Sequence, residues 1–385
     1  DSTIFRGHQA TVRCANIGSV ETFMKLWHEE CQHRPHSGGV AVVLGAGNVT
    51  GLAAADAVSQ IFEYGRAVLL KLHPVQSSLV TVFRSALKPL IEAGLLRVVI
   101  GDTELVSEAI SDKKVTAMHL TGGEETFRNI IRSNKSELDV KEITCELGNV
   151  TPWIVVPGKY SEKDLLYQAD QVAASIANNS SFNCIATKVV LTSRHWPQRQ
   201  QFLDRIEQRL ASLPGRSAWY PGAIDLYQKA TGQSITGGLL KPRLLQDVQR
   251  DDQPHWFAQE WFIPIAVETA VDGDSIEEFC MEISRLVHEL PGTLAASVTR
   301  PDGMATHDAS RVELLIEHLR YGVVAVNAWS ALAYAVANIP WGGFPGGTIE
   351  DPQSGIGHVH NPQFLPLVHN SILRAPLRVW PTPPW

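Results

Sequence analysis

The chain lacks the cysteine pattern of a disulfide-bonded or metal-binding domain. Its 385 residues include five cysteines, an odd number, scattered without the close spacing of zinc ligands. Free thiols of this kind favour a reducing compartment, so we expect a cytoplasmic protein without a bound metal. The histidines among the first 38 residues also lack HxxxH or HExxH spacing, and we interpret them as surface residues.

Long apolar runs and excess positive charge are missing as well. No apolar run reaches the roughly 20 residues of a membrane-spanning helix, and the N-terminus has no secretory pattern. The formal net charge of −7 argues against nucleic acid or an anionic membrane as the main partner. With 44% hydrophobic and 19% charged residues, a chain of this length can form two domains with a sizeable core.

From residue 40 onward, apolar strand patterns alternate regularly with amphipathic helix patterns. Five strands are predicted, at 40–44, 67–72, 96–100, 115–120 and 143–147. This alternation predicts a parallel, doubly wound α/β sheet, on which ligands bind beyond the carboxyl ends of the strands. The residues at those ends are Asn48, Lys71, Thr121-Gly122-Gly123 and Glu146.

The glycine fingerprint GxGxxG of many dinucleotide-binding folds is absent. The segment from Gly45 to Gly51 is one residue too long for it. Thr121-Gly122-Gly123 precedes a helix that begins at Glu124, and could present free backbone N–H groups to a phosphate. A plain strand-to-helix turn explains the same glycines equally well, so both interpretations stay open.

A second α/β segment is predicted from about 150 to 325, and it contains the polar stretch 178–188. A helical pattern runs into this stretch and a short apolar strand pattern follows it, so Cys184 is expected on a loop between two packed elements. A thiol braced in this way is a candidate nucleophile, while the alternative is a buried cysteine acting as a small hydrophobe. From residue 328 the chain is rich in proline, glycine and tryptophan, which predicts an irregular tail packed on the body.

Several short blocks, taken in order from residue 40 to residue 357, resemble the signatures of the NAD(P)-dependent aldehyde dehydrogenase superfamily. The strongest pair is Glu146 in Glu-Leu-Gly-Asn and, about forty residues later, Cys184 in Asn-Cys-Ile-Ala. The other blocks are Gly47-Asn48, Leu70-Lys71, Thr121-Gly122-Gly123, Gln259-Glu260-Trp261-Phe262-Ile263-Pro264, Val326-Asn327 and Ser354-Gly355-Ile356-Gly357. The resemblance implies an aldehyde-dehydrogenase-like fold, with a Rossmann-type cofactor-binding domain over 1–147, an α/β catalytic thiol domain over 148–339 and an irregular C-terminal tail over 340–385.

The resemblance also implies a role for each candidate residue. Cys184 would attack an aldehyde as a thiolate, and Asn48 would help to hold the resulting oxyanion. Glu146 would activate the water that hydrolyses the thioester to a carboxylic acid. The cofactor, NAD or NADP, would be bound by Lys71, Thr121, Gly122, Gly123, Glu260 and Phe262. Ordinary surface or strand-end roles are the alternatives for Glu146, Lys71 and Glu260.

The sequence departs from the family pattern at several places. Pro74 replaces a glutamate that often repels the 2′-phosphate of NADP, so we expect NADP to be accepted beside NAD. Ser181-Phe182 replaces a common Gly-Gln before the cysteine, and Ile263 replaces a common glycine, so both loops are expected to change shape. The part before Asn48 is shorter than usual, so the elements that join subunits into a homodimer or homotetramer are expected to be reduced.

Three alternative functions stay open at the level of sequence. They are a CoA-acylating aldehyde dehydrogenase or acyl-CoA reductase, a catalytically silent nucleotide-binding family member, and an unrelated cysteine hydrolase. Glu146 argues against the first, because transfer to CoA needs no base that activates water. Aromatic side chains near the motifs favour an apolar or aromatic aldehyde, although core packing is the commoner role for such residues. These side chains are Trp153, Phe182, Trp261, Trp329 and Tyr334.

Overall fold

The computed structural model describes residues 6–36, 38–138, 141–235 and 237–379. The chain divides into two compact units. Unit 1 contains residues 1–11, 149–336 and 372–385, and unit 2 contains residues 12–148 and 337–371. Within the described ranges, no helix combines the length and apolar character needed to cross a bilayer.

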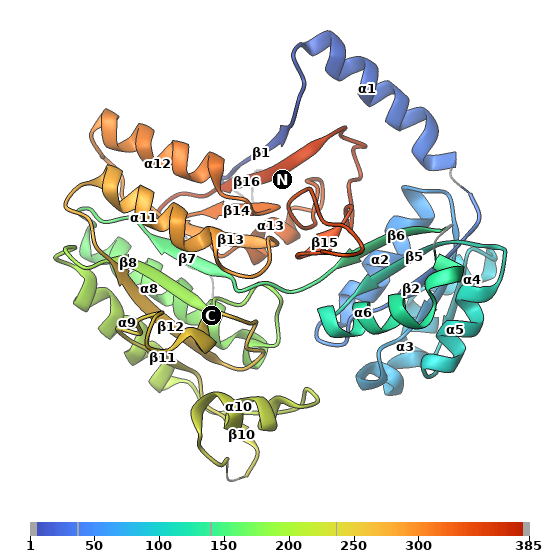
Figure 1. Ribbon diagram of the computed structural model, residues 1–385, viewed down its shortest axis with the longest axis horizontal. Helices are drawn as coiled ribbons and strands as arrows, with labels where there is room; N and C mark the ends of the chain where they lie inside the picture. Colours follow the sequence, from blue (N-terminus) through green and yellow to red (C-terminus); the bar gives the residue numbers. More distant parts are fainter. Residues whose placement is uncertain (1–5, 37, 139–140, 236, 380–385) are drawn as a thin grey trace. The chain divides into compact units, whose positions relative to one another are not determined.

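Unit 2 holds a six-stranded sheet with the order β15-β6-β5-β2-β3-β4. Figure 1 labels β2, β5, β6 and β15 of this sheet. Its strands are β2 (Val40–Leu44), β3 (Ala67–Lys71), β4 (Leu96–Val99), β5 (Val115–Thr121), β6 (Glu142–Glu146) and β15 (Gly355–Ile356). Strands β2 to β6 pair in parallel, and β15 pairs antiparallel with β6. The five strands and the parallel sheet predicted from the apolar runs are therefore confirmed, with strand ends shifted by at most one residue.

Helices cover both faces of the unit 2 sheet, because successive side chains of each strand point to opposite faces. On one face Val43 and Leu70 pack with α2 (Thr50–Phe62), α3 (Val80–Ala86) and α4 (Lys88–Glu92). On the other face Val42 and Leu44 pack with α5 (Thr103–Ser111), α6 (Glu124–Ser133) and α7 (Lys135–Leu138). The remaining helices of unit 2 are α1 (Val20–His33), η1 (Arg34–His36) and η2 (Pro74–Leu79). The result is the doubly wound arrangement expected from the sequence.

The larger sheet has eight strands in the order β1-β16-β14-β13-β7-β8-β12-β11. They are β1 (Gln9–Cys14), β7 (Pro152–Val155), β8 (Val189–Ser193), β11 (Arg243–Leu245), β12 (Ile265–Val271), β13 (Ala295–Thr299), β14 (Val323–Val326) and β16 (Val368–Arg374). The six strands from β14 to β11 run parallel. The second α/β segment predicted from about 150 to 325 is therefore present.

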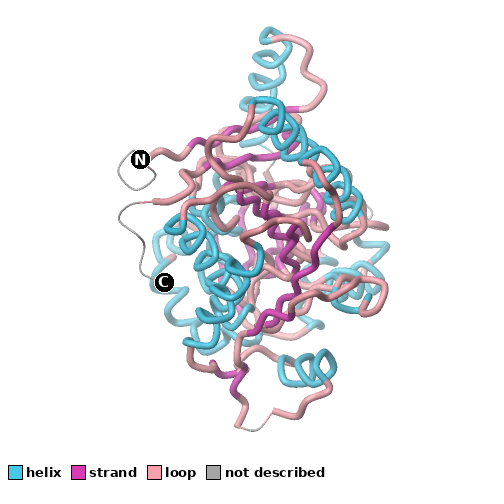
Figure 2. Tube along the Cα trace, turned by 90° about the vertical axis from the view of Figure 1, so that its left-hand side faces the viewer, coloured by secondary structure: helices cyan, strands magenta, loops and turns pink. Residues whose placement is uncertain are grey.

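The helices of unit 1 also lie on both sides of their sheet. Helices α8 (Glu162–Ala177) and α9 (Arg199–Ser212) pack with Trp153 and Val190, while α11 (Ile276–His288) and α12 (Thr306–His318) pack with Ile154 and Leu191. The tube in Figure 2 shows strands flanked by helices in this way. Smaller elements are η3 (Asn178–Ser181), α10 (Ala223–Thr231), η4 (Pro254–Trp256), α13 (Ala331–Ala335) and the pair β9 (Arg216–Ser217) and β10 (Leu239–Leu240).

The C-terminal tail is more regular than its composition indicated. The prediction of an irregular segment from residue 340 missed β15 and the seven-residue strand β16. Strand β16 mixes polar and apolar residues and follows a segment rich in proline and glycine, so its local pattern is weak. Its partner in the sheet, which the local sequence does not show, makes it a strand.

Candidate active site

Four of the predicted residues lie along one edge of the unit 2 sheet. Asn48 follows β2, Lys71 ends β3, Thr121 ends β5 and Glu146 ends β6. The four strands are parallel neighbours, and Thr121 and Glu146 are register partners on adjacent strands. The structure thus brings these residues together at the carboxyl edge, where parallel α/β sheets bind ligands.

The turn that carries Asn48 requires its glycines. A Cβ atom on Gly45 would lie 2.5 Å from the Cβ of Ala53, and one on Gly47 would lie 2.4 Å from Nδ1 of His73. The side-chain amide of Gln76 donates to the Gly47 carbonyl at 3.2 Å. The backbone of this turn is therefore packed tightly between α2 and the segment after β3.

The end of β3 is polar but carries no acidic side chain next to Lys71. Burial lowers the pKa of the Lys71 ammonium, and the Asp102 carboxylate opposes that shift. Two residues on, Nδ1 of His73 accepts from the Val75 backbone N–H at 3.3 Å and caps η2, with Pro74 as the first residue of that helix. A proline thus stands where the family often has a glutamate.

The glycines after β5 serve mainly as a turn. The Gly122 N–H donates to the Glu146 carbonyl at 3.0 Å, which favours the plain-turn interpretation at this residue. The parallel pairing of β5 and β6 continues one step beyond Thr121 and uses this donor. Gly123 begins α6 without a side-chain cap, and a Cβ there would meet nothing within 4 Å. The open part of this turn therefore starts at Gly123.

A buried polar cluster surrounds the Thr121 hydroxyl and forms hydrogen bonds with it. Its Oγ1 lies 2.9 Å from Oδ2 of Asp56 on α2 and 3.2 Å from Nε2 of His119. Nδ1 of His119 lies 2.8 Å from Oγ1 of Thr144. Burial raises the pKa of Asp56, as does the Glu146 charge, whereas burial lowers the pKa of His119 to about 4. Sequence reasoning missed this cluster, because its members are far apart along the chain.

Glu146 is buried at the end of β6 and is held by the C-terminal part of unit 2. Its Oε2 accepts from the Trp341 indole N–H at 2.8 Å. The Ser354 hydroxyl donates to the Gly148 carbonyl at 2.9 Å, and a Cβ on Gly355 would lie 2.4 Å from the Cys145 carbonyl. The Ser354-Gly355 block thus packs directly against the strand that carries the carboxylate.

Cys184 lies in unit 1 on a loop between α8 and β8, as predicted. The three residues Asn179, Ser180 and Ser181 have φ values of 53°, 54° and 65°, in the left-handed region that side chains other than glycine disfavour. The Asn183 amide donates to Oδ1 of Asn178 at 3.1 Å. The loop is therefore an ordered and strained structure.

The backbone around the half-buried Cys184 is fixed from outside the loop. The Thr151 hydroxyl lies 3.3 Å from the Cys184 carbonyl and 3.0 Å from Oδ1 of Asn149. The Trp329 indole N–H donates to the Ile185 carbonyl at 2.8 Å. Trp329, one of the aromatic substrate candidates, thus anchors the loop directly. Asn149, the last residue of the Glu-Leu-Gly-Asn block, anchors it through Thr151.

A buried lysine that sequence reasoning missed joins two of the predicted segments. The Lys188 ammonium donates to Oγ of Ser181 at 2.8 Å and to the Ile263 carbonyl at 3.1 Å. Burial lowers its pKa to about 7, and Glu260 opposes that shift. Its position four residues after Cys184 was the only signal in the sequence.

Some aromatic residues near the motifs lie in the hydrophobic core, and others pack against one another. Trp153 and Trp261 are buried, and their indole N–H groups donate to Thr299 and to the His255 carbonyl. They therefore belong to the core. Four further residues, whose neighbouring ring centroids are 5.0–5.6 Å apart, form what we call the aromatic cluster: Phe182, Trp219, Tyr220 and Phe262.

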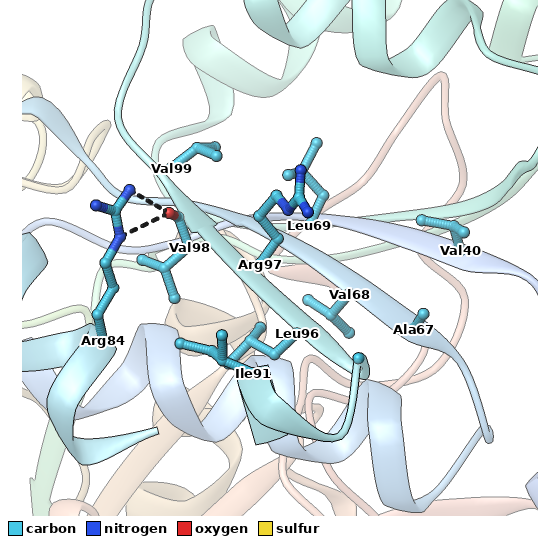
Figure 3. Close-up of a pocket in the computed structure, with 11 residues that line it drawn as sticks. Val40, Ala67, Val68, Leu69, Arg84, Ile91, Leu96, Arg97, Val98 and Val99 are labelled. Carbon is cyan, nitrogen blue, oxygen red and sulfur yellow. Dashed lines mark hydrogen bonds between the residues drawn. The ribbon is translucent and has the colours of Figure 1, made fainter. Parts of the chain in front are cut away.

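A hollow on unit 2 lies around β3 and β4, and its lining includes Val99, the register partner of Lys71 (Figure 3). There the Arg84 guanidinium donates to the Val98 carbonyl at 2.9 Å and occupies part of the free edge of β4. Strand β4 is four positions from β6 in the sheet order, or roughly 19 Å at the usual strand spacing. The hollow is a protected sheet edge that lies apart from Glu146.

Known proteins share both the sequence pattern and the fold. An aspartate-semialdehyde dehydrogenase (non-phosphorylating) from Halomonas elongata is 25% identical over 293 residues, which are 69% of this chain and 53% of that protein. The chain thus spans about half the length of this curated relative.

Two solved structures show the same fold. An indole-3-acetaldehyde dehydrogenase in complex with NAD+ aligns with a TM-score of 0.66 and 21% identity, over 88% of this chain and 68% of that one. A glyceraldehyde-3-phosphate dehydrogenase from Methanocaldococcus jannaschii complexed with NADP aligns with a TM-score of 0.67 and 18% identity, over 88% and 72%. The aldehyde dehydrogenase family model matches residues 14–224, more than half of the sequence. The chain therefore belongs to the aldehyde dehydrogenase family.

Proposed function

We propose that this chain oxidises an aldehyde to a carboxylic acid with NAD+ or NADP+, through a thioester on Cys184. The observation that carries the proposal is the placement of three residues inside the family-matched segment. Cys184 lies on a braced loop of unit 1, and Asn48 and Glu146 lie at the carboxyl edge of the unit 2 sheet. These are the residue types that thiol-dependent aldehyde oxidation needs.

We assign cofactor binding mainly to unit 2. Its carboxyl edge offers the Lys71 ammonium for ribose hydroxyls, and the open turn at Gly123 leads into the ten-residue helix α6, whose first amides suit a pyrophosphate. From unit 1, Glu260 would hold the nicotinamide ribose beside Phe262. Relatives solved with NAD+ and with NADP support this assignment, and bound NAD(P)+ supplies the hydride acceptor.

The protein residues supply the nucleophile and the oxyanion donors. The Cys184 thiolate forms a C–S bond with the aldehyde carbon, and the carbonyl π electrons move to oxygen. The Asn48 amide and the Cys184 backbone N–H stabilise that oxyanion, with about 3–4 kcal/mol lost for each donor removed. Loss of hydride from the same carbon leaves a thioester on Cys184.

Glu146 promotes the hydrolysis that releases the carboxylic acid from Cys184. Its carboxylate takes a proton from a water molecule that attacks the thioester, and the C–S bond breaks with return of the electron pair to sulfur. The Trp341 indole N–H, 2.8 Å from Oε2, fixes the orientation of this carboxylate. A general base in this role contributes about 10²–10⁴-fold.

We further propose an apolar or aromatic aldehyde as substrate. The aromatic cluster begins two residues before Cys184, and Trp219 is 41% exposed, so an aromatic surface adjoins the thiol loop. A homodimer or homotetramer remains our prediction for the assembly, to be measured by light scattering.

The test is a panel of aldehydes assayed with NAD+ and NADP+, each with and without free CoA. Hydrolytic oxidation should appear without CoA, with aliphatic or aromatic aldehydes preferred over charged ones. Turnover that requires CoA would establish the acyl-transfer alternative, and nucleotide binding without turnover of any aldehyde would establish a silent family member.

A further inference from the structure

The Lys188 side chain is a buried cross-link inside unit 1. Only 2% of the residue is exposed, although lysine is rarely buried without a partner. Nζ lies 2.8 Å from Oγ of Ser181, 3.1 Å from the Ile263 carbonyl and 3.5 Å from the Ser181 carbonyl. One ammonium group therefore joins two segments that are far apart in the sequence, one at Ser181 and the other at Ile263.

The first of these segments carries Cys184. Ser181 precedes the cysteine by three residues and has a φ of 65°, which is strained for a residue with a side chain. Glycine would adopt this φ more easily, but it has no hydroxyl for Lys188 to bind. Ser181 thus has a strained backbone conformation, and its hydroxyl anchors the loop to Lys188.

The second segment, residues 260–263, carries Glu260 and Phe262. The backbone of Lys188 is itself fixed, because its N–H donates to the Thr151 carbonyl at 2.9 Å and its carbonyl accepts from the Val267 N–H at 2.9 Å. The Lys188 side chain therefore extends from a fixed backbone position directly before β8. Near neutral pH the amine retains at least two N–H donors in either protonation state, enough for Ser181 and Ile263.

We propose that Lys188 is a positioning residue that holds the Cys184 loop against residues 260–263, with the Ser181 hydroxyl as the point of attachment. The cross-link keeps the thiol and the cofactor-facing segment of unit 1 in one fixed arrangement. The roles given to Cys184 and Glu260 rest on the proposed function. The cross-link itself can be measured without any activity.

The first experiment measures amide hydrogen exchange of residues 178–187 in the free protein. Lys188→Met and Ser181→Ala should each speed exchange in this peptide about tenfold, and the double variant should be no faster than the faster single variant. Lys163→Met on the exposed face of α8 makes the same chemical change and should leave the peptide unaffected. Unchanged exchange in folded Ser181→Ala, or additive effects in the double variant, would overturn the proposal.

The second experiment separates positioning from general destabilisation. Ser181→Ala should slow the burst of reduced cofactor about tenfold and leave the cofactor Kd within about twofold, because it releases only the thiol loop. Lys188→Met should change both quantities, because it also releases residues 260–263. An equal effect of the two variants on Kd would contradict the assignment.

The two experiments also distinguish this inference from the proposed function. If the wild-type protein oxidises no aldehyde, the proposed function fails, while the exchange measurements still decide whether the cross-link exists. If Lys188→Met does not fold, Ser181→Ala keeps the lysine and tests the same contact.

Discussion

The indole N–H of Trp341 donates to Oε2 of Glu146 at 2.8 Å, although the two residues are 195 positions apart. Trp341→Phe keeps a six-membered aromatic ring and removes the pyrrole ring with its N–H donor, so the buried carboxylate loses a charge-assisted hydrogen bond worth about 1.5–3 kcal/mol. We expect hydrolysis of the thioester to slow about tenfold, with a smaller effect on its formation. Stopped-flow burst and steady-state rates check this. Trp196→Phe removes a comparable indole bond, to the Gly158 carbonyl, and should leave the ratio of the two rates unchanged.

Cys184→Ala should abolish dehydrogenase turnover and leave cofactor affinity nearly intact. The rival thiol is Cys145, which is buried and whose pKa is raised to about 12 by that burial, so it is protonated and inert at neutral pH. Alkylation at neutral pH followed by peptide mass spectrometry should label Cys184 and spare Cys145. Preferential labelling of Cys145 would remove Cys184 from its proposed role.

Glu146→Gln should separate formation of the thioester from its hydrolysis, because the amide keeps the size of the side chain and lacks the base. Mixing the variant with aldehyde and cofactor should give a burst of up to one reduced cofactor per active site, followed by slow turnover. Mass spectrometry should find the acyl group on Cys184. If the burst itself is slow, raising the pH should restore it, since the thiol then ionises unaided. Wild-type turnover that depends on CoA and is unaffected by Glu146→Gln would refute hydrolysis.

Pro74 begins η2 where a glutamate often excludes NADP, so NAD+ and NADP+ should differ by less than about 1.4 kcal/mol, or tenfold in affinity. Pro74→Glu should weaken NADP+ binding and leave NAD+ binding nearly unchanged, because only NADP+ carries the 2′-phosphate. Calorimetric titration of both nucleotides measures the difference. A thousandfold preference of the wild-type protein for NAD+ would show that another residue discriminates.

Asp56 and His119 should affect stability with opposite dependence on pH. The pKa of His119 falls from 6.5 to about 4 on folding, so between these values the unfolded chain binds more protons and the free energy of unfolding rises with pH. Burial raises the pKa of Asp56, so its contribution falls as pH rises above 3.8. Urea unfolding between pH 4 and 6.5 should therefore show a steeper rise for Asp56→Asn than for wild type and a flatter one for His119→Gln. Asp112→Asn, an exposed change before the start of β5, is the control. Parallel curves for all four proteins would contradict the opposing contributions.

The sequence by itself was sufficient for the parallel sheet of unit 2, for a second α/β segment and for most of the candidate residues. Apolar runs of five residues alternate with helical patterns, and both signals depend on neighbours only a few positions apart. The carboxyl ends of such strands share one edge, so Asn48, Lys71, Thr121 and Glu146 could be grouped without coordinates. Cys184 stood out because a helical pattern and a strand pattern enclose its polar loop. The resemblance to the family then ordered these residues into roles.

Only the tertiary structure determined which residues support the candidate site residues. Trp341 reaches Glu146, and Lys188 reaches Ile263, through contacts between segments that no local pattern connects. The Gly122 amide pairs with the Glu146 carbonyl because of the register of β5 and β6, which favours the plain-turn interpretation over a phosphate contact at this residue. Trp153 and Trp261 belong to the core because the folded chain buries both side chains. Register, burial and long-range hydrogen bonds depend on which elements become neighbours, and that is determined when the whole chain buries its apolar surface.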